Sequence, residues 1–278
     1  MPELAYVNGS IMPIEEAVVP IEDRGYQFGD AVYEVITSLN GRPFMLDAHL
    51  ARLERSMTEL SFPHFDMRQI RAAVLKLFAE GALDRCGLYI QISRGVAPRK
   101  HAFPASTALQ FIMTLRKIVP YPDEMRAGGV KAVTVPDLRW GKCDIKTIQL
   151  LYNVLAKQQA LDSGAYDAIF VSTDGVVRES TSSNLFIAVD GILITHPLTR
   201  NILPGITRQC LLEISRECAI PCEERSFKTD ALYAADEVFL SGTITEVMPI
   251  VEVDGRTIAN GEVGPIARRL LRKLHDKM

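Results

Sequence analysis

One lysine, Lys146, has a setting suited to covalent chemistry, because apolar Ile145 precedes it and Ile148 follows two residues later. An amine among apolar neighbours loses part of its hydration, which favours the neutral form that attacks carbonyl groups. We expect a helix from about Thr147 to Asp162, so Lys146 would stand immediately before it. The alternative is a surface lysine at a helix start, with its aliphatic stem lying on apolar neighbours. Spacing alone does not choose between the two.

A glycine turn before a helix is the second candidate. The run Leu203-Pro204-Gly205-Ile206-Thr207-Arg208 leads into an expected helix from about Thr207 to Cys218. The free N–H groups and the dipole of a helix N-terminus attract anions such as phosphate, and the Thr207 hydroxyl adds a donor. Ser241-Gly242-Thr243 follows an expected strand at Glu237–Leu240 and would add further N–H groups. An ordinary helix cap, with Thr207 as N-cap or first-turn residue, explains the first run equally well.

Charged or ionisable side chains at three further places could bind polar groups of a ligand. Arg52 lies one turn after His49 on an expected helix. Arg99 and His101 lie two residues apart on a proline-containing loop, where they could grip a carboxylate. Glu179 ends a strand before a hydroxyl-rich turn, and a buried carboxylate there would need a partner such as a protonated ring nitrogen. Each position also fits an ordinary solvent-exposed side chain.

A strand is the first element expected to position these residues. Ala31–Leu39 is rich in β-branched residues and ends at Asn40-Gly41, which is typical of a two-residue hairpin turn. Side chains of a strand alternate between its faces, so Tyr33 and Glu34 should point to opposite sides of the sheet.

Two helices and two strands are expected next along the chain. Asp47 should cap the first helix and Asp66 the second, which Gly81 should close. The first helix has apolar residues at 3-4-3 spacing: Leu50, Leu53, Met57 and Leu60. The strands are expected around Gly87–Ser93 and Ala108–Leu115.

The regular pattern breaks at Val119-Pro120-Tyr121-Pro122-Asp123, which is typical of a linker. We therefore predict a small N-terminal α/β domain at residues 1–118, an interdomain linker at 119–124, and a larger C-terminal domain at 125–278 that carries Lys146. The clustering of strands and helices predicts an α+β fold rather than a doubly wound sheet.

The composition of the chain excludes several classes of protein. Its 278 residues are 47% hydrophobic and 23% charged, as in an ordinary globular protein, and the net charge of −3 does not favour binding to nucleic acid or membranes. The N-terminus lacks a signal-peptide pattern, and no apolar run approaches the ~20 residues of a membrane helix. The five cysteines show no CxxC spacing, so we expect free thiols, no metal site and a cytoplasmic location.

Read together and in order, these segments resemble the fold-type IV enzymes that use pyridoxal 5′-phosphate (PLP), and among them the D-amino-acid aminotransferases. The matching segments are Glu22–Glu34, Arg94–Pro104, Asp137–Trp140, Cys143–Lys146, Ser182–Phe186 and Leu203–Arg208. The resemblance spans almost the whole chain, and several motifs in a fixed order are far more specific than any one of them. It implies a two-domain α+β fold, the cofactor PLP and a homodimer.

The resemblance also implies roles for residues around the cofactor. Lys146 would hold PLP as a Schiff base and carry the proton between the substrate Cα and the cofactor. Glu179 would pair with the pyridine nitrogen and keep it protonated, so that the ring acts as an electron sink. The residues implied to hold the phosphate, or to line its site, are Arg52, Ile206, Thr207, Gly242 and Thr243.

Another set of residues would contact the substrate. Tyr33, Arg99 and His101 would bind its α-carboxylate, the last two from the partner subunit. Ser182 and Ser183 would lie near substrate and cofactor. The implied reaction is transamination between a D-amino acid and a 2-oxo acid, either 2-oxoglutarate or pyruvate, through pyridoxamine phosphate.

Two departures from the D-specific pattern leave rival functions open. Ser241–Val247 is closer to the Gly-Thr run of branched-chain aminotransferases, and Thr147-Ile148-Gln149 differs from the family's usual Ser-Leu-Asn. The rivals on the same fold are an L-branched-chain aminotransferase and an aminodeoxychorismate lyase. A more remote rival is a PLP-binding protein without catalytic activity.

Overall fold

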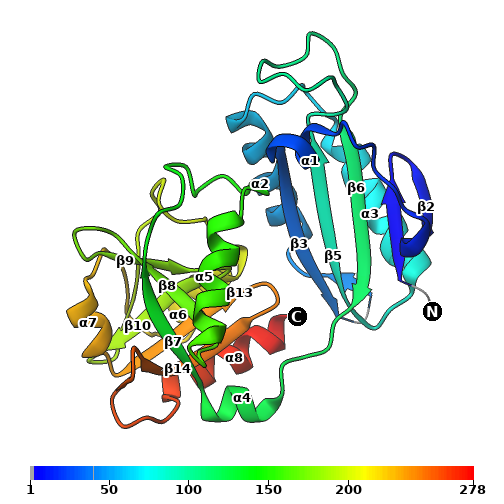
Figure 1. The fold of residues 1–278 in the computed structure, drawn as a ribbon. Helices are drawn as coiled ribbons and strands as arrows, with labels where there is room; N and C mark the ends of the chain where they lie inside the picture. The colour runs from blue at the N-terminus through cyan, green and yellow to red at the C-terminus, as the bar shows by residue number, and fades with distance from the viewer. Residues whose placement is uncertain (1–2, 40) are drawn as a thin grey trace. The chain divides into compact units, whose positions relative to one another are not determined.

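The computed structural model describes residues 3–39 and 41–278, which divide into two compact units (Figure 1). Unit 1 comprises Met1–Val119 and Ile145–Gln149, and unit 2 comprises Pro120–Asp144 and Leu150–Met278. The predicted linker at 119–124 includes the point where the units part, but the boundary differs in one respect. The segment around Lys146 packs with unit 1, whereas we expected the C-terminal domain to carry it.

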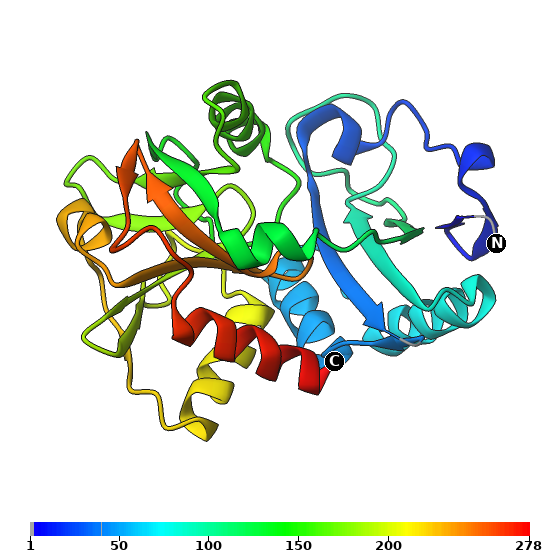
Figure 2. The same cartoon turned by 90° about the horizontal axis from the view of Figure 1, so that it is seen from below.

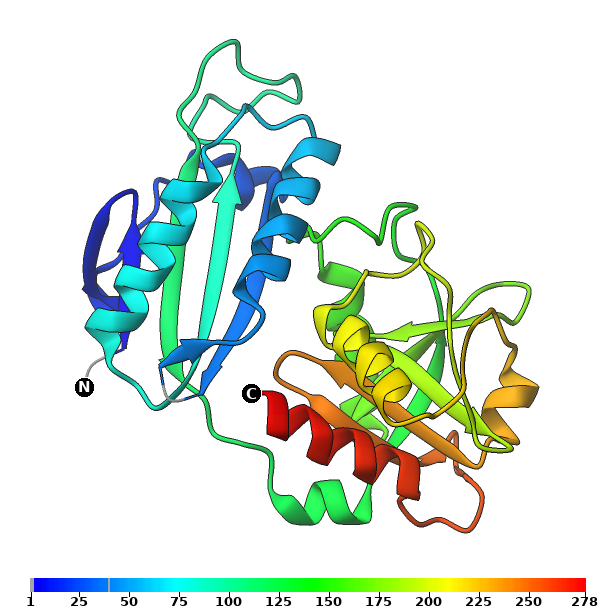
Figure 3. The ribbon, with the colours of Figure 1, turned by 180° about the vertical axis from the view of Figure 1, so that it is seen from behind.

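Unit 1 is a 6-stranded antiparallel sheet with order β2-β1-β6-β5-β3-β4 and helices on one face. Its elements are β1 (Leu4–Val7), β2 (Ser10–Pro13), the 3-10 helix η1 (Ile14–Glu16), α1 (Arg24–Phe28), β3 (Ala31–Leu39), β4 (Arg42–Pro43), α2 (Leu46–Glu59), α3 (Met67–Gly81), β5 (Arg85–Ser93) and β6 (Gln110–Lys117). Figure 3 shows α2 and α3 lying over the same face of the sheet, where Ile36, Leu53 and Leu77 are fully buried.

Strand β3 is the element that orients two of the predicted residues. It occupies the expected range, and Leu39 pairs with Arg42 as in a two-residue hairpin. Gly41 has the positive φ of +71° that such a turn requires, while the other turn residue, Asn40, lies outside the described residues. Glu34 is fully buried toward the helices, and the half-buried Tyr33 lies on the opposite face, as the alternation predicts.

The helix ends of unit 1 differ from expectation at two residues. Helix α2 begins one residue before Asp47, with Met45 as N-cap, and the exposed Asp47 carboxylate pairs with Arg71 instead of capping. Asp66 caps α3 as predicted, accepting a hydrogen bond of 2.9 Å from the Arg68 N–H. Gly81 does not close α3 in a left-handed turn; it is the last helical residue, where a Cβ would lie 2.3 Å from Leu115 Cδ2.

The helix expected from Thr147 begins four residues later, at Leu151. The residues before it form an extended segment along β3: the Tyr33 N–H donates to the Lys146 carbonyl at 3.0 Å, and Thr147 forms a β-bridge with Val32. β-Branched side chains such as Thr147 suit extended backbone, and these hydrogen bonds satisfy groups that a helix would satisfy locally.

Unit 2 contains a 9-stranded sheet, in which eight strands follow the order β12-β11-β10-β13-β14-β7-β8-β9 and β15 is the ninth, paired with β14. Its elements are α4 (Asp123–Gly128), β7 (Val130–Pro136), α5 (Leu151–Asp162), β8 (Asp167–Val171), β9 (Val177–Ser180), β10 (Asn184–Val189), β11 (Ile192–Thr195), α6 (Ile206–Glu217), β12 (Cys222–Glu224), α7 (Thr229–Tyr233), β13 (Glu237–Gly242), β14 (Glu246–Val253), β15 (Arg256–Thr257) and α8 (Pro265–Lys277). The pairing of Glu179 with Asn184 joins β9 to β10, so part of the sheet closes into a barrel.

Helices cover the sheet of unit 2 on two sides. Figure 2 shows α5 on one side and α6 with α8 on the other. Phe186 of β10 and Phe239 of β13 are cross-strand partners, fully buried, and their rings stack with centroids 5.1 Å apart. None of the helices in the described part of the chain has the length and apolar character needed to span a bilayer. The five cysteines are all unpaired.

Candidate active site

Lys146 and Tyr33 lie together in unit 1. The Lys146 amine Nζ stands 4.2 Å from the centroid of the Tyr33 ring, and the Lys146 backbone N–H donates to Ser56 Oγ at 3.3 Å. A cation over an aromatic face is attracted by the ring, and an amine there keeps a fixed direction. The strand-like segment thus delivers Lys146 to the face of β3 that presents Tyr33.

On the other face of β3, Arg52 is held by Glu34. Glu34 Oε1 accepts from Arg52 Nε at 2.7 Å, and Oε2 accepts from Arg52 Nη2 and lies against His49 Nδ1, both at 2.8 Å. Burial by itself would raise the pKa of Glu34, but the Arg52 charge and these hydrogen bonds outweigh it and hold the pKa at about 2. Burial lowers the pKa of His49, against the opposing effect of Glu34. The sequence analysis did not identify Glu34 as the residue that orients Arg52. The signal was present, because Glu34 faces the side of the sheet that the helices cover, and His49 and Arg52 lie one turn apart on α2.

Arg99 and His101 are exposed on their loop and flank one aromatic ring. The Arg99 guanidinium carbon lies 4.9 Å from the centroid of the Phe28 ring, and the His101 ring meets the same ring edge-on at 5.6 Å. The two side chains predicted to share a carboxylate therefore gather around one residue of α1.

Arg24 and Arg94, two buried arginines that sequence reasoning did not single out, anchor this loop. Arg24 donates to the carbonyls of Lys100 at 2.7 Å, His101 at 3.3 Å and Ala102 at 3.4 Å. The guanidinium of Arg94 lies 3.6 Å from the centroid of the Phe103 ring. Both arginines also pair with Asp30, at 2.8 and 2.9 Å. The segments Glu22–Glu34 and Arg94–Pro104 contain both, so only their roles were missed.

Glu179 is one of the buried carboxylates of unit 2. Its Oε1 accepts from Arg139 Nη1 at 2.6 Å, and its Oε2 accepts from Asn184 Nδ2 and from the Leu203 N–H, both at 3.0 Å. Burial raises the pKa of Glu179, while the Arg139 guanidinium and the Leu203 N–H oppose that shift. Arg139 is itself held by an ion pair with Asp137 at 2.9 Å. The sequence analysis included both residues in the segment Asp137–Trp140 but gave them no role.

The start of α6, where Gly205 is the N-cap, presents backbone N–H groups of the kind that can bind an anion. The N–H groups of Ile206 and Thr207 stand in the first turn and have no partner within the helix. A Cβ at Gly205 would lie only 2.0 Å from Asn184 Oδ1, so only glycine fits there. Thr207 is buried and lies in the first turn of α6. Of the two placements predicted for it, N-cap or first-turn residue, the structure has the second.

The turn between β13 and β14 carries Gly242 and Thr243, both half-buried. A Cβ at Gly242 would lie 2.8 Å from Ser183 Oγ, so this backbone lies close to the buried Ser183, whereas Ser182 is exposed. Ser241 is buried, and its hydroxyl has no hydrogen-bond partner among the described residues. Ser241 is the cross-strand partner of Asn184, so the two side chains share a face of the sheet.

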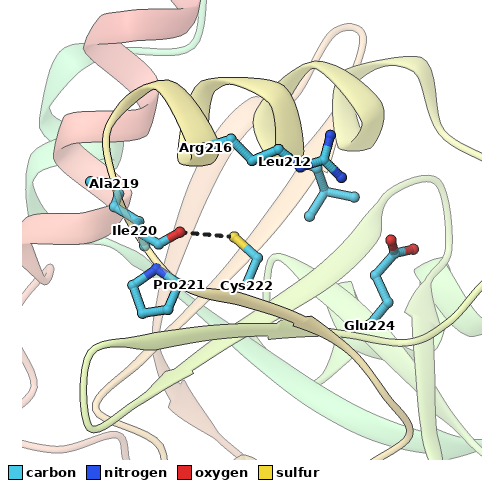
Figure 4. A pocket seen from close by; sticks show the side chains of 7 residues that line it. All are labelled: Leu212, Arg216, Ala219, Ile220, Pro221, Cys222 and Glu224. Atoms are coloured by element: carbon cyan, nitrogen blue, oxygen red, sulfur yellow. Dashed lines mark hydrogen bonds between the residues drawn. The ribbon is translucent and has the colours of Figure 1, made fainter.

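An open pocket elsewhere in unit 2 contains none of these residues. It lies beside the second half of α6 and β12, and Figure 4 shows its lining side chains. They are Leu212, Arg216, Ala219, Ile220, Pro221, Cys222 and Glu224.

Comparison with known proteins identifies the family. The family model described as "Amino-transferase class IV" matches residues 31–253 of the chain. The chain belongs to this family. This class IV aminotransferase is 41% identical to the D-alanine aminotransferase of Bacillus licheniformis over 98% of its own length and 95% of that protein. It is 40% identical to the D-alanine aminotransferase of Staphylococcus epidermidis, over 95% of this chain and 94% of that one.

Solved structures of class IV aminotransferases share the fold of this one. The branched-chain amino acid aminotransferase of Escherichia coli is similar with a TM-score of 0.92 and 25% identity, over 99% of this chain and 94% of that chain. A hypothetical aminotransferase from Mycobacterium tuberculosis gives 0.87 and 26%, over 99% and 98%. The predicted family and the predicted α+β fold are therefore confirmed.

Proposed function

We propose that this class IV aminotransferase binds PLP and transfers an amino group between a D-amino acid and a 2-oxo acid, either 2-oxoglutarate or pyruvate. The observation that carries the substrate assignment is the placement of Arg99 and His101 around Phe28, on a loop that Arg24 anchors. The D-alanine aminotransferases, at 40–41% identity, support the same substrate class. One solved relative contains pyridoxamine 5′-phosphate, which supports the cofactor.

The residues of unit 2 fit the phosphate of PLP. The first N–H groups of α6 have no acceptor within the helix, and the hydroxyl of Thr207 offers a further donor. Gly205 and Gly242 stand where a Cβ would collide, and the buried Ser241 hydroxyl lacks a partner among the described residues. We assign the phosphate to Ile206, Thr207 and Thr243, with Gly242 and Ser183 beside it, and the family resemblance adds Arg52 to this set.

Glu179 fits the pyridine nitrogen of PLP. Burial raises the pKa of this carboxylate, and the Arg139 guanidinium opposes that shift. A protonated ring nitrogen would be a second positive partner, to which the ionised carboxylate offers a hydrogen-bond acceptor. When bound, PLP supplies an electron sink for the negative charge that develops at the substrate Cα.

Lys146 is the base in this proposal. Its Nζ would take the proton that leaves the substrate Cα, and the adjacent Tyr33 ring would stabilise the ammonium group formed by that step. Tyr33, together with Arg99 and His101 from the partner subunit, would hold the substrate carboxylate. Ser182 and Ser183 would lie beside the bound substrate.

We also propose that the chain is a homodimer. Helix α5 presents large apolar side chains to solvent: Leu151 is 73% exposed, Val154 60% and Leu155 58%. They recur at helical spacing on one stripe, and an exposed apolar stripe is typical of a contact surface between proteins.

A second candidate, an L-branched-chain aminotransferase, has support of its own. The Ser241–Val247 segment resembles that of the branched-chain enzymes, and branched-chain aminotransferases are among the similar solved structures. One experiment separates the two candidates. The purified protein is incubated with PLP, 2-oxoglutarate and, in separate reactions, racemic alanine or racemic leucine, and the amino acids are resolved by chiral chromatography. We expect loss of D-alanine and formation of D-glutamate. Loss of L-amino acid, or formation of L-glutamate, would contradict the proposal and favour the second candidate.

A further inference from the structure

We infer that Arg126, on the short helix α4, is a positioning residue that holds the β13–β14 turn in the shape needed to bind phosphate. The inference rests on the proposed binding of PLP, because the turn is the one that carries Gly242 and Thr243. Arg126 belongs to no motif of the sequence analysis and lies far from the turn in the chain.

The turn contains a residue in an unfavourable backbone conformation. Strands β13 and β14 pair as far as Gly242 and Glu246, which leaves residues 243–245 as a three-residue loop. Glu246 then has a φ of +56°. Glu246 is the first residue after the loop, and glycine normally fills a position with such a φ because a Cβ makes the left-handed conformation costly. Here a buried glutamate fills it.

Arg126 supplies contacts on both sides of that residue. Its Nη1 donates to the Thr245 carbonyl at 3.1 Å and to the Val247 carbonyl at 2.7 Å, and its Nη2 pairs with Glu246 Oε2 at 2.8 Å. The guanidinium is 8% exposed, so water competes little for these bonds. One planar group therefore fixes three consecutive residues, a geometry that a lysine ammonium does not match.

The Glu246 side chain has a second partner, and the turn has a second tie. His275 Nε2 lies 2.7 Å from Glu246 Oε2 at the end of α8. Ser183 Oγ donates to Thr245 Oγ1 at 3.2 Å. Release of the Arg126 contacts would let residues 245–247 relax toward an ordinary φ, and the neighbouring N–H groups of the turn would lose their common direction.

The test measures how fast the PLP-loaded protein loses its cofactor on dilution into PLP-free buffer, followed by the visible absorbance of bound PLP. Arg126→Gln should release PLP about tenfold faster or more, the usual cost of losing hydrogen bonds from a charged group. Lys131→Gln is the matched control, because it removes an exposed ion pair to Glu252 in the same unit, and its release rate should equal that of the wild type. Equal release by Arg126→Gln and wild type would overturn the inference.

Double variants separate positioning from a general loss of packing. Adding Glu246→Gly to Arg126→Gln should slow PLP release again, because glycine adopts the left-handed conformation without a clamp. Adding Glu246→Gln should not, because it removes the charge of Glu246 but keeps the unfavourable backbone. The same rate for both double variants would overturn the inference.

Two single variants keep the inference testable where Arg126→Gln fails to fold. With Arg126 in place, Glu246→Ala should lose PLP faster than Glu246→Gly, and equal rates would overturn the inference. A wild-type protein that takes up no PLP would contradict the proposed function and this inference with it. A wild type that retains PLP no better than Arg126→Gln contradicts this inference alone.

Discussion

At the residue scale, Tyr33 and Glu34 show how the two faces of strand β3 serve different purposes. Tyr33 faces the Lys146 amine, and the next residue, Glu34, neutralises and orients Arg52 on the helix side. A carboxylate held in this way fixes the guanidinium direction, so that Arg52 does not depend on a ligand for its position.

The Lys146→Ala variant should abolish repeated turnover. Removal of a general base commonly costs 10²–10⁴-fold in rate, and this lysine would also hold the cofactor, so we expect a loss of at least about a thousandfold. Steady-state turnover of D-alanine with 2-oxoglutarate measures it. Lys142→Ala, a lysine of the same loop, should stay within about twofold of wild type. A Lys146→Ala variant that cycles at the wild-type rate would remove this residue from the mechanism.

The Glu34→Gln variant should destabilise the fold in a pH-dependent way. The pKa of Glu34 falls from 4.5 to about 2 on folding, so its contribution is complete above about pH 4.5 and disappears as the pH falls toward 2. The shift corresponds to roughly 3 kcal/mol at neutral pH. Urea unfolding of both proteins between pH 7 and pH 3 should show a gap in free energy of unfolding that narrows in acid.

The exposed Glu54 of α2, the helix that carries Arg52, provides the control for Glu34, and Glu54→Gln should change the free energy of unfolding by less than about 0.5 kcal/mol. A Glu34→Gln gap that is absent at pH 7, or constant down to pH 3, would show that the carboxylate does not carry this stability.

At the element scale, the loop that carries Arg99 and His101 owes its shape to α1. Helix α1 has only five residues, yet Arg24 opens it and Phe28 ends it, and both meet the loop. Three consecutive carbonyls of residues 100–102 accept bonds from one buried guanidinium. The loop is therefore fixed through its backbone, which leaves the two side chains free to bind a carboxylate.

The Arg24→Gln variant should raise the KM for D-alanine about tenfold, because the loop loses its backbone anchor while Lys146 and Glu179 stay in place. The absorbance of bound PLP should be unchanged, which separates this effect from loss of cofactor. Arg68→Gln removes a fully exposed arginine of the same unit and should leave the KM unchanged. An unchanged KM in Arg24→Gln would contradict the anchoring role.

The Gly205→Ala variant should bind PLP at least about tenfold more weakly. The new methyl group would meet Asn184 Oδ1 at 2.0 Å, so either the start of α6 or the Asn184 contact with Glu179 must shift. Titration of cofactor-free protein with PLP measures the affinity. Gly128→Ala, where the methyl group meets nothing within 4 Å, should bind PLP as wild type does. Equal affinities would mean that Gly205 is not required by the anion site.

The elements that the sequence predicted well are those with local signals. Strand β3 and the cap of α3 by Asp66 follow from residue type and spacing over a few positions. The prediction of a helix from Thr147 was wrong for the residues before Leu151, because their hydrogen bonds go to β3, more than a hundred residues earlier. Gly81 was misread for a similar reason: the glycine accommodates Leu115 of β6 rather than a left-handed turn.

At the scale of the whole molecule, motifs predicted the candidate residues but not the roles of the residues that support them. Lys146 and Glu179 stand in short motifs with a fixed order along the chain. Arg126 contacts residues 245–247, and Arg24 contacts residues 100–102, so each acts across a separation that no local pattern encodes. Their roles could be read only from the folded chain.

The wild-type protein should be a dimer by size-exclusion chromatography with light scattering. Leu155→Glu should shift it toward monomer, because a charge on the apolar stripe of α5 costs free energy when the stripe is covered. Glu80→Gln, an exposed change on α3, should leave the dimer intact. A monomeric wild type, or a Leu155→Glu dimer of wild-type stability, would contradict the proposed interface.

The most direct test of the central claim, that this chain transaminates D-amino acids with PLP, is a half-reaction without a 2-oxo acid. PLP-loaded protein is mixed in turn with D-alanine and L-leucine, and the visible absorbance of bound PLP is followed. We predict that the band disappears with D-alanine and persists with L-leucine. Loss of the band with L-leucine but not with D-alanine would contradict the claim. It would mean that the turn at Gly242-Thr243 predicts the substrate class better than Arg99 and His101 do.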